Sequence, residues 1–440
     1  MYSNKHIAKI SSPIFFSLLA TNFIQVVDTA FLGRVGEVEL GASALAGIIY
    51  VAVYTIGFGF SMGSQILIGR RNGEKNYNQI GNIVVQGGAF LLLIALLQIP
   101  LLKYATDNWM HFIFNSKEVA DAVSEYLDWR LYGLVFSFVN LMFRAFYIGV
   151  ARTKVLTINS VVMGIVNILF DYGLIFGNFG MPELGISGAA IASVIAEFSS
   201  TVFFIIYTKK TVDLEKYGFT SIKYNWSVIK GILNISIFMM VQYLFSVSTW
   251  FMFFLLTENY MGQRSLAVTN IVRSLYTIVT LPSHALGSAT STLVSNTIGA
   301  GKTEEVLNLI KRLTLISLGL MLITMLVMAV FPRAVVGIYT EDSELISQAI
   351  KPLFVMISSL PLYSMGSVLF SSVSGSGNTK KALTFEVIAL VFYVTYMWFI
   401  IVYLRSSVAL AWTTEHVYWF FLTVLSLIYM RSGKWKESKI

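Results

Sequence analysis

Long apolar runs, separated by short polar turns, extend over almost the whole sequence. Each run approaches or exceeds the roughly 20 residues that a helix needs to cross a hydrocarbon core about 30 Å thick. A helix also satisfies its own backbone hydrogen bonds in lipid. The pattern predicts an all-α integral membrane protein with twelve spans, at residues 13–33, 41–68, 81–105, 126–150, 155–179, 184–208, 231–256, 263–298, 308–331, 348–374, 382–404 and 408–430.

Composition supports this fold class and excludes several functions. Of the 440 residues, 56% are hydrophobic and 12% are charged, whereas soluble domains carry roughly 25% charged residues. The sequence has no cysteine and four scattered histidines, so disulfides, iron–sulfur clusters and thiolate zinc sites are excluded. We therefore expect no redox centre, no metal cofactor and no other cofactor.

The basic residues predict an orientation in the membrane, because Lys and Arg concentrate in cytoplasmic loops. With both termini inside, and with cations near the span ends assigned to the adjacent side, 21 cations fall in the cytoplasm and 8 outside. This predicts a multi-pass protein of the inner (cytoplasmic) membrane with both termini in the cytoplasm. Membrane topology thus explains the net charge of +8, and we expect a lipid bilayer and no nucleic acid as partner. The first apolar segment lacks a small-residue cleavage site, which predicts a retained helix.

Two landmarks repeat at one offset, which indicates an internal duplication. Arg152-Thr153-Lys154 lies 226 residues before Asn378-Thr379-Lys380, and the Gly-containing turn 69–75 pairs at the same offset with 295–301. We predict a first lobe of six helices over 1–208, a basic cytoplasmic linker over 209–230, a second six-helix lobe over 231–430 and a cytoplasmic tail over 431–440. Such halves are typical of transporters, whose substrates bind between the repeats.

The carboxylic acids of the predicted spans include Asp28, Asp171, Glu197 and Glu386. An ionisable group at membrane depth is costly, so each is a candidate functional residue. Asp28 and Asp171 lie 15 and 16 residues into spans that run in the same direction. At about 1.5 Å per residue the two carboxyls share one depth and could meet.

Each of these two aspartates continues a polar stripe on one helical face. The stripes consist of Thr21, Gln25 and Asp28 in the first span and Asn159, Asn167 and Asp171 in the fifth. Two carboxyls in a low-dielectric pocket raise each other's proton affinity, and carboxylates with amide oxygens also suit sodium. The sequence leaves open whether the coupling ion is H⁺ or Na⁺, and whether the aspartates only hydrogen-bond neighbouring helices.

The remaining acids have less definite interpretations. Glu197 could face the same pocket or pair with another polar group. Glu386 follows Lys381 by five residues, which favours a side chain that reaches to the cytoplasmic surface. The repeat positions of the aspartates in the second half hold no acid, so we expect buried acids to form a site in the first half alone.

Spans of the second half instead offer amide and aromatic side chains that suit varied amphiphilic ligands. The candidate cavity residues are Gln242, Tyr243, Trp250 and Tyr276. Side chains of these types are also ordinary components of a membrane core, and the sequence alone does not separate the two interpretations.

The run Val27–Gly36, followed by Leu45-Ala46-Gly47, resembles the first-helix signature of multidrug and toxic compound extrusion (MATE) exporters. Further similarity lies in Gly63-Ser64-Gln65, Arg70–Glu74, the Asn167 and Asp171 pattern, and the segment Leu293–Lys302. The resemblance covers nearly the whole chain. It points to the prokaryotic, DinF-like branch within the multidrug/oligosaccharidyl-lipid/polysaccharide (MOP) flippase superfamily.

This resemblance implies two six-helix bundles and export of cationic or lipophilic small molecules in exchange for inward H⁺ or Na⁺. It assigns the coupling cation to Asp28, Asn167 and Asp171, and matches a helix-six hydroxyl to Ser193. Pro13 resembles a helix-one proline at which some members bend, although Pro13 begins the predicted span, where a proline is harmless. The second half lacks the helix-seven glutamate and helix-ten aspartate of other members, which argues against a sodium site there.

Two other functions compete with an exporter. A flippase for lipid-linked oligosaccharides shares the architecture, but it would need more embedded cations than Arg144 and Arg273 to bind diphosphate. A membrane-embedded enzyme would need paired surface carboxylates for magnesium or a His-Glu zinc motif, and neither spacing is present. We therefore expect a monomeric transporter of small molecules and not an enzyme.

Overall fold

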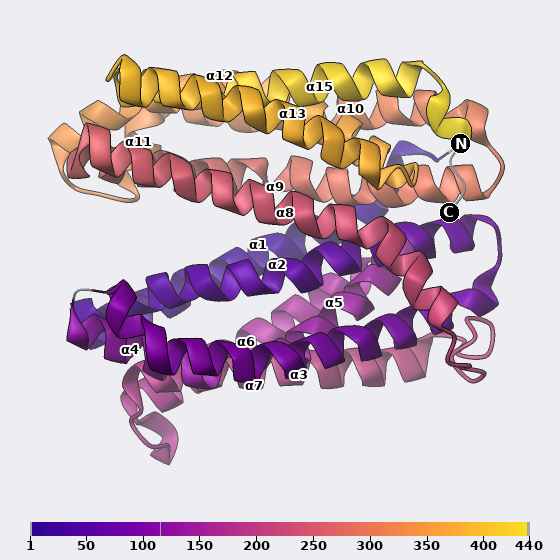
Figure 1. Cartoon of the computed structure of the whole chain (residues 1–440), viewed down its shortest axis with the longest axis horizontal. Coiled ribbons are helices and arrows are strands. Elements are labelled where there is room, and N and C mark those ends of the chain that lie inside the picture. Colours follow the sequence, from indigo (N-terminus) through magenta and orange to yellow (C-terminus); the bar gives the residue numbers. More distant parts are fainter. Residues whose placement is uncertain (1, 115, 438–440) are drawn as a thin grey trace. The chain divides into compact units, whose positions relative to one another are not determined.

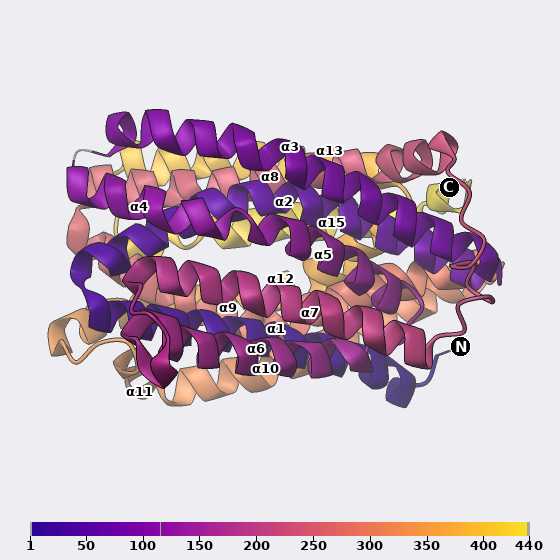
Figure 2. The same cartoon turned by 90° about the horizontal axis from the view of Figure 1, so that it is seen from below.

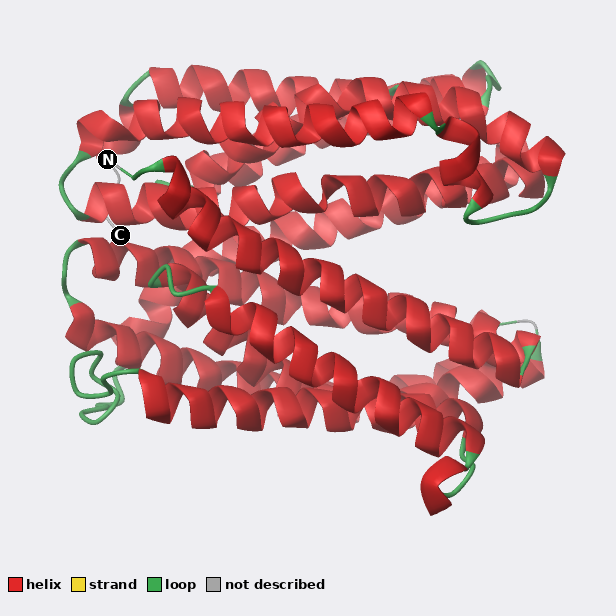
Figure 3. Ribbon diagram, turned by 180° about the vertical axis from the view of Figure 1, so that it is seen from behind, coloured by secondary structure: helices red, strands yellow, loops and turns green. Residues whose placement is uncertain are grey.

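The computed structural model describes residues 2–114 and 116–437. Over these residues the chain consists of helices and connecting loops, with no β-strand (Figure 3). It forms two compact units, one of Phe16–Met240 and one of Met1–Phe15 together with Val241–Ile440. Two long helices, α1 and α8, contribute residues to both units. Figure 1 shows the whole chain, coloured along the sequence from indigo at the N-terminus to yellow at the C-terminus.

The unit Phe16–Met240 is built from seven helices and the beginning of an eighth. They are α1 (Asn4–Val35), α2 (Glu37–Gly73), α3 (Ile80–Ile113), α4 (Lys117–Arg130), α5 (Gly133–Gly149), α6 (Lys154–Phe176), α7 (Gly185–Thr211) and α8 (Trp226–Met261), with 3₁₀ turns η1 (Tyr77–Gln79) and η2 (Asn178–Gly180).

The second unit contains the rest of α8 and the helices that follow it. They are α9 (Gln263–Gly299), α10 (Val306–Val330), α11 (Pro332–Gly337), α12 (Ser343–Gly375), α13 (Thr379–Trp398), α14 (Val408–Ala411) and α15 (Thr414–Arg431), with the 3₁₀ turns η3 (Thr303–Glu305) and η5 (Lys434–Glu437) and the π-helical turn η4 (Phe399–Tyr403). Figure 1 shows α12 and α15 side by side, in agreement with their extensive packing.

The helices account for the apolar runs of the sequence. Among residues 2–114 and 116–437, nine helices are long and apolar enough to cross a membrane, and α4 with α5, bent by 51°, form a tenth candidate. Two further long helices, α9 and α15, are less apolar and account for the eighth and twelfth predicted spans. The predicted all-α membrane fold is confirmed, and the count of twelve spans is approximately consistent with it.

Lipid exposure is visible in α10, which presents apolar side chains on its outer face. Leu322, Ile323, Leu326 and Val330 are between 51% and 65% exposed. In water such a stripe would be unfavourable, but a bilayer is as apolar as these side chains. The exposed face of α10 is therefore the surface that a membrane protein is expected to turn toward lipid.

Helix α6 packs closely against α7 over most of its length (Figure 2). A Cβ atom at Gly188 would collide with the backbone carbonyl of Leu174. The backbone N–H of Leu184 donates to that same carbonyl at 2.8 Å. Only glycine allows the two helices to approach this closely, as is common where membrane helices meet.

Three helix boundaries differ from the sequence-based expectation. Helix α1 begins at Asn4, so Pro13 lies in its interior and not at its start. A break at residues 131–132 separates α4 from α5, where a single span was predicted. Helix α7 continues to Thr211 and α8 begins at Trp226, so the connection between them covers residues 212–225.

Candidate functional site

Helices α1 and α6 are aligned in parallel, and this brings Asp28 to Asp171. The hydroxyls of Ser17 and Ser160 are hydrogen-bonded at 2.7 Å. The carboxyl groups of Asp28 and Asp171 interact directly, each eleven residues further along its own helix. Equal spacing on both helices corresponds to about three turns, so one register satisfies both contacts. The two aspartates that the sequence places at one depth are thus neighbours.

The aspartate pair is surrounded by acceptor atoms that lack donors. Asp171 is fully buried and Asn167 is 1% exposed, whereas Asp28 is half-buried. No described residue donates a hydrogen bond to either Asp171 oxygen or to the Oδ1 atoms of Asp28 and Asn167. Buried acceptors are nearly always paired in proteins. A shared proton or a small hard cation is the partner that such a group of oxygens can take.

The other predicted residues of this site differ in burial and in hydrogen bonding. Asn159 is buried and donates through Nδ2 to Ser200 Oγ at 2.9 Å, which ties α6 to α7. Ser193 on α7 is half-buried and Gln25 on α1 is exposed. Neither Ser193 nor Gln25 forms a hydrogen bond with the aspartates in the described part of the chain. Their roles remain predictions.

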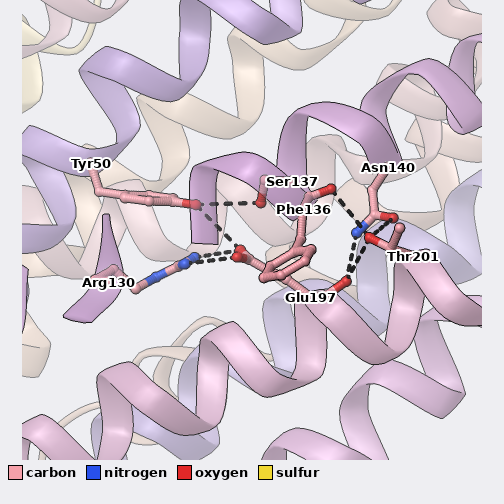
Figure 4. Close-up of polar contacts among 7 residues, drawn as sticks. All are labelled: Tyr50, Arg130, Phe136, Ser137, Asn140, Glu197 and Thr201. Carbon is pink, nitrogen blue, oxygen red and sulfur yellow. Dashed lines mark hydrogen bonds and ion pairs between the residues drawn. The ribbon is translucent and has the colours of Figure 1, made fainter. Parts of the chain in front are cut away.

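Glu197 is engaged by Arg130 in a buried ion pair, which Figure 4 shows together with Tyr50. The guanidinium donates to the two carboxylate oxygens at 2.6 and 2.9 Å. The hydroxyl of Tyr50 donates to Oε1 at 3.3 Å, and the Tyr50 ring lies 3.8 Å from the guanidinium carbon. Of the two interpretations of Glu197, these contacts favour pairing with another polar group.

Arg130, one of the eight cations that the predicted topology counts on the outer side, is buried among the helices. Its side chain is only 13% exposed, because α4 begins at Lys117, nine residues before the predicted span 126–150, and packs against α2, α3 and α7. Arg130 and Tyr126, one turn earlier on α4, both lie within electrostatic reach of Asp28. The ion pair and the aspartate pair therefore form one polar region.

The second unit contains a cavity of about 340 Å³ between α8, α9, α12, α13 and α15. All four predicted cavity residues line it: Gln242, Tyr243, Trp250 and Tyr276. The structure thus brings the four predicted cavity residues, which come from α8 and α9, together in one pocket. Whether they contact substrate stays a prediction.

Two glutamates also line this cavity, which corrects the expectation that buried acids belong to the first half alone. Glu386 is 1% exposed and Glu415 is 4% exposed. Glu386 does not reach the cytoplasmic surface, because its carboxylate accepts from Tyr418 at 2.6 Å and from Ser246 at 3.2 Å. The interpretation from its distance to Lys381 was wrong.

A periodic signal in the sequence could have revealed these acids. Glu415, Tyr418, Trp419 and Leu422 recur at i, i+3, i+4 and i+7, the spacing of one helical face, and all line the cavity. Glu386, Leu390 and Tyr393 follow the same rule on α13. An acid that shares a face with aromatic residues points into the bundle and not toward the surface.

Comparison with known proteins places the chain among transporters. The model of the MatE family matches residues 13–173 and 238–399, nearly three quarters of the sequence. The chain belongs to the MatE family. This MatE-family chain is 24% identical over 440 residues to a probable multidrug resistance protein NorM from Thermotoga maritima, covering 99% of this chain and 94% of that protein.

Solved structures share the MatE-family fold over almost the full length. A MOP superfamily transporter from Pyrococcus furiosus, described as having a binding pocket of reversed polarity, superimposes with a TM-score of 0.90 at 17% identity, over 99% of this chain and 97% of that one. A multidrug resistance MATE transporter in an outward-facing conformation gives a TM-score of 0.89, with the same identity and coverage. These relatives are named as transporters and not as enzymes.

Proposed function

We propose that this MatE-family protein is a secondary active exporter, which exchanges cytoplasmic cationic or lipophilic compounds for inward H⁺ or Na⁺. The observation that carries the proposal is the contact of half-buried Asp28 with fully buried Asp171, whose oxygens accept no hydrogen bond from a described residue. Relatives named for multidrug resistance support the substrate class. The proposal includes a location in the cytoplasmic membrane with both termini inside, in accordance with the distribution of basic residues.

The aspartate pair supplies the coupling because neither aspartate forms an ion pair with a described residue. Glu197 is already neutralised by Arg130 at 2.6 Å, whereas Asp28 and Asp171 accept no hydrogen bonds at three of their four oxygens from the described residues. Two carboxylates held together at low dielectric repel each other, and a proton or Na⁺ removes that repulsion. Asn167 would orient its amide oxygen toward the same ion.

Export requires that the ion and the substrate favour different conformations. In the outward-facing state the ion binds Asp28 and Asp171, and this biases the protein toward the inward-facing state, where substrate is taken up. Pro13 supplies a place at which α1 can bend, because an interior proline removes a backbone hydrogen bond. Ion binding at Asp28, fifteen residues further along α1, is then coupled to the conformation of that helix.

The test is efflux of the fluorescent organic cation ethidium, measured in inverted membrane vesicles under an imposed proton gradient and, separately, a sodium gradient. The native protein is compared with Asp28→Asn, which removes one coupling charge. Asp107→Asn serves as the matched control, since Asp107 is exposed near the end of α3.

We expect the native protein and the control to respond to one of the two gradients and Asp28→Asn to respond to neither. A response of Asp28→Asn equal to that of the native protein would contradict the site assignment. Absence of ethidium transport by every variant, with normal protein levels, would contradict the substrate class and favour the oligosaccharide flippase.

A further inference from the structure

The cavity of the second unit combines a wall of aromatic rings with buried acids. Tyr243, Trp250, Tyr276, Tyr363 and Trp419 are among the rings that line its volume of about 340 Å³. This volume is in the range of pockets that enclose small organic ligands. The negative faces of aromatic rings attract cations, most strongly where water is excluded.

Glu386 provides a carboxylate oxygen to which no described residue donates a hydrogen bond. Its Oε1 accepts the hydroxyls of Tyr418 and Ser246, but Oε2 is buried and accepts no hydrogen bond from any described group. The Oε1 of Gln242, also at the cavity wall, lacks a donor as well. Two buried acceptors without donors, on side chains that line one cavity, call for a ligand with a positive charge or with donor hydrogens.

Glu415 differs from Glu386, because aromatic side chains of the cavity wall donate hydrogen bonds to its carboxylate. Its Oε2 accepts from the Tyr276 hydroxyl at 2.9 Å and from the Trp419 indole N–H at 3.2 Å. The same indole donates to the Tyr276 oxygen at 3.0 Å. Glu415 also lies in the first turn of α15, where the helix dipole stabilises an anion. Glu415 therefore positions the rings, whereas Glu386 faces the ligand.

The arrangement suits an organic cation better than a metal ion. Nowhere in residues 2–114 and 116–437 do three or more acidic or histidine side chains converge as metal ligands. The cavity is also about ten times the volume of a water molecule, whose share of liquid volume is roughly 30 Å³. A bare ion would leave most of this space unfilled, but a cation with an aromatic body would fill it.

We propose that this cavity binds the cationic substrate, and that Glu386 of α13 is the residue that selects for positive charge. The rings supply affinity for the apolar body of the ligand, with no requirement for charge. The open carboxylate oxygen of Glu386 supplies the discrimination between a cation and a neutral molecule of the same shape. This inference rests on the proposed export function and adds to it the site and the charge-selecting residue.

The test is a binding measurement by isothermal titration calorimetry on the purified full-length protein in detergent, with no ion gradient. The probes are tetraphenylphosphonium, which carries a permanent positive charge, and triphenylphosphine oxide, a neutral molecule of related shape. The variants are Glu386→Gln, which keeps the side-chain shape, and Glu304→Gln as the matched control, since Glu304 is exposed in the same unit.

We expect Glu386→Gln to weaken tetraphenylphosphonium binding on the order of ten- to a hundredfold, because a charge-assisted contact is lost. Binding of triphenylphosphine oxide should change by less than about twofold, and Glu304→Gln should match the native protein with both probes. Equal weakening of both probes would assign Glu386 a structural role and overturn the inference. An unchanged affinity for tetraphenylphosphonium would overturn it too.

The outcome separates this inference from the proposed function. Charge-selective binding that depends on Glu386, in a protein that exports nothing under either gradient, would refute the export function and keep the site. Gradient-driven export by a protein in which Glu386→Gln does not alter charge selectivity would refute the site and keep the export function.

Discussion

Breaking the Arg130–Glu197 pair should destabilise the first unit strongly, and the loss should depend on both partners. The two side chains are 13% and 12% exposed, so neither can reach water easily when its partner is removed. Arg130→Leu strands the carboxylate, and Glu197→Leu strands the guanidinium. A stranded buried charge costs about 3–5 kcal/mol, whereas removal of both charges leaves none unpaired.

The assay is a double-mutant cycle, with unfolding followed by circular dichroism in mixed micelles of dodecyl maltoside and dodecyl sulfate. We expect each single variant to lose about 3–5 kcal/mol of unfolding free energy. The double variant should lose no more than either single one, so that the two losses fail to add by about 3 kcal/mol or more. The bidentate hydrogen bonds at 2.6 and 2.9 Å are the physical source of this coupling.

The exposed pair Lys103–Asp128 in the same unit provides the control. Its atoms are 3.3 Å apart and its side chains are 34% and 42% exposed, so Asp128→Asn should cost less than about 1 kcal/mol. Additive losses for Arg130 and Glu197, within about 0.5 kcal/mol, would refute the conclusion that the two side chains form one interacting unit.

Three further perturbations test other parts of the account. Pro13→Ala should raise the unfolding temperature, since an interior proline costs a helix about 3 kcal/mol, and should slow ethidium efflux if α1 must bend there; unchanged efflux would contradict the bend. Gly133→Ala should reduce efflux and stability together, because a Cβ at this position would collide with the Arg130–Glu197 pair; native values for both would contradict that contact. Asp342 caps α12 by accepting the backbone N–H of Leu345, which lowers its pKa below the ordinary value. Its contribution is therefore complete above about pH 4 and lost as the pH falls below that value, so amide exchange at Leu345, corrected for its intrinsic pH dependence, should accelerate in acid; a constant corrected rate would contradict the cap.

Hydropathy predicts most of this fold because a bilayer requires every span to be a helix of about 20 mostly apolar residues. The predicted span 263–298 and the observed helix Gln263–Gly299 agree almost residue for residue. The break between α4 and α5 escapes the rule: α4 is far more polar than α5, and Leu131 and Tyr132, which occupy the break, are both compatible with a continuous helix. It is set by packing that sequence periodicity does not contain.

The candidate sites could likewise be predicted from the sequence only in part. Asp28 and Asp171 could be paired from depth alone, because parallel spans carry residues of equal offset to equal depth. Glu386 and Arg130 could not be placed this way, because their distance from the nearest charge says nothing about which side of the helix they occupy. Their partners, Tyr418 and Glu197, are far away in sequence, and only the fold brings them into contact.

The most direct test of coupling at the aspartate pair compares two transport modes of purified protein in proteoliposomes, for the native chain and Asp171→Asn. One mode is uptake of ethidium driven by a proton or sodium gradient, and the other is ethidium exchange at equilibrium with no gradient. The account predicts that Asp171→Asn loses gradient-driven uptake and keeps exchange, because the substrate can still cross while the ion no longer binds. Gradient-driven uptake at the native rate by Asp171→Asn would contradict the central claim.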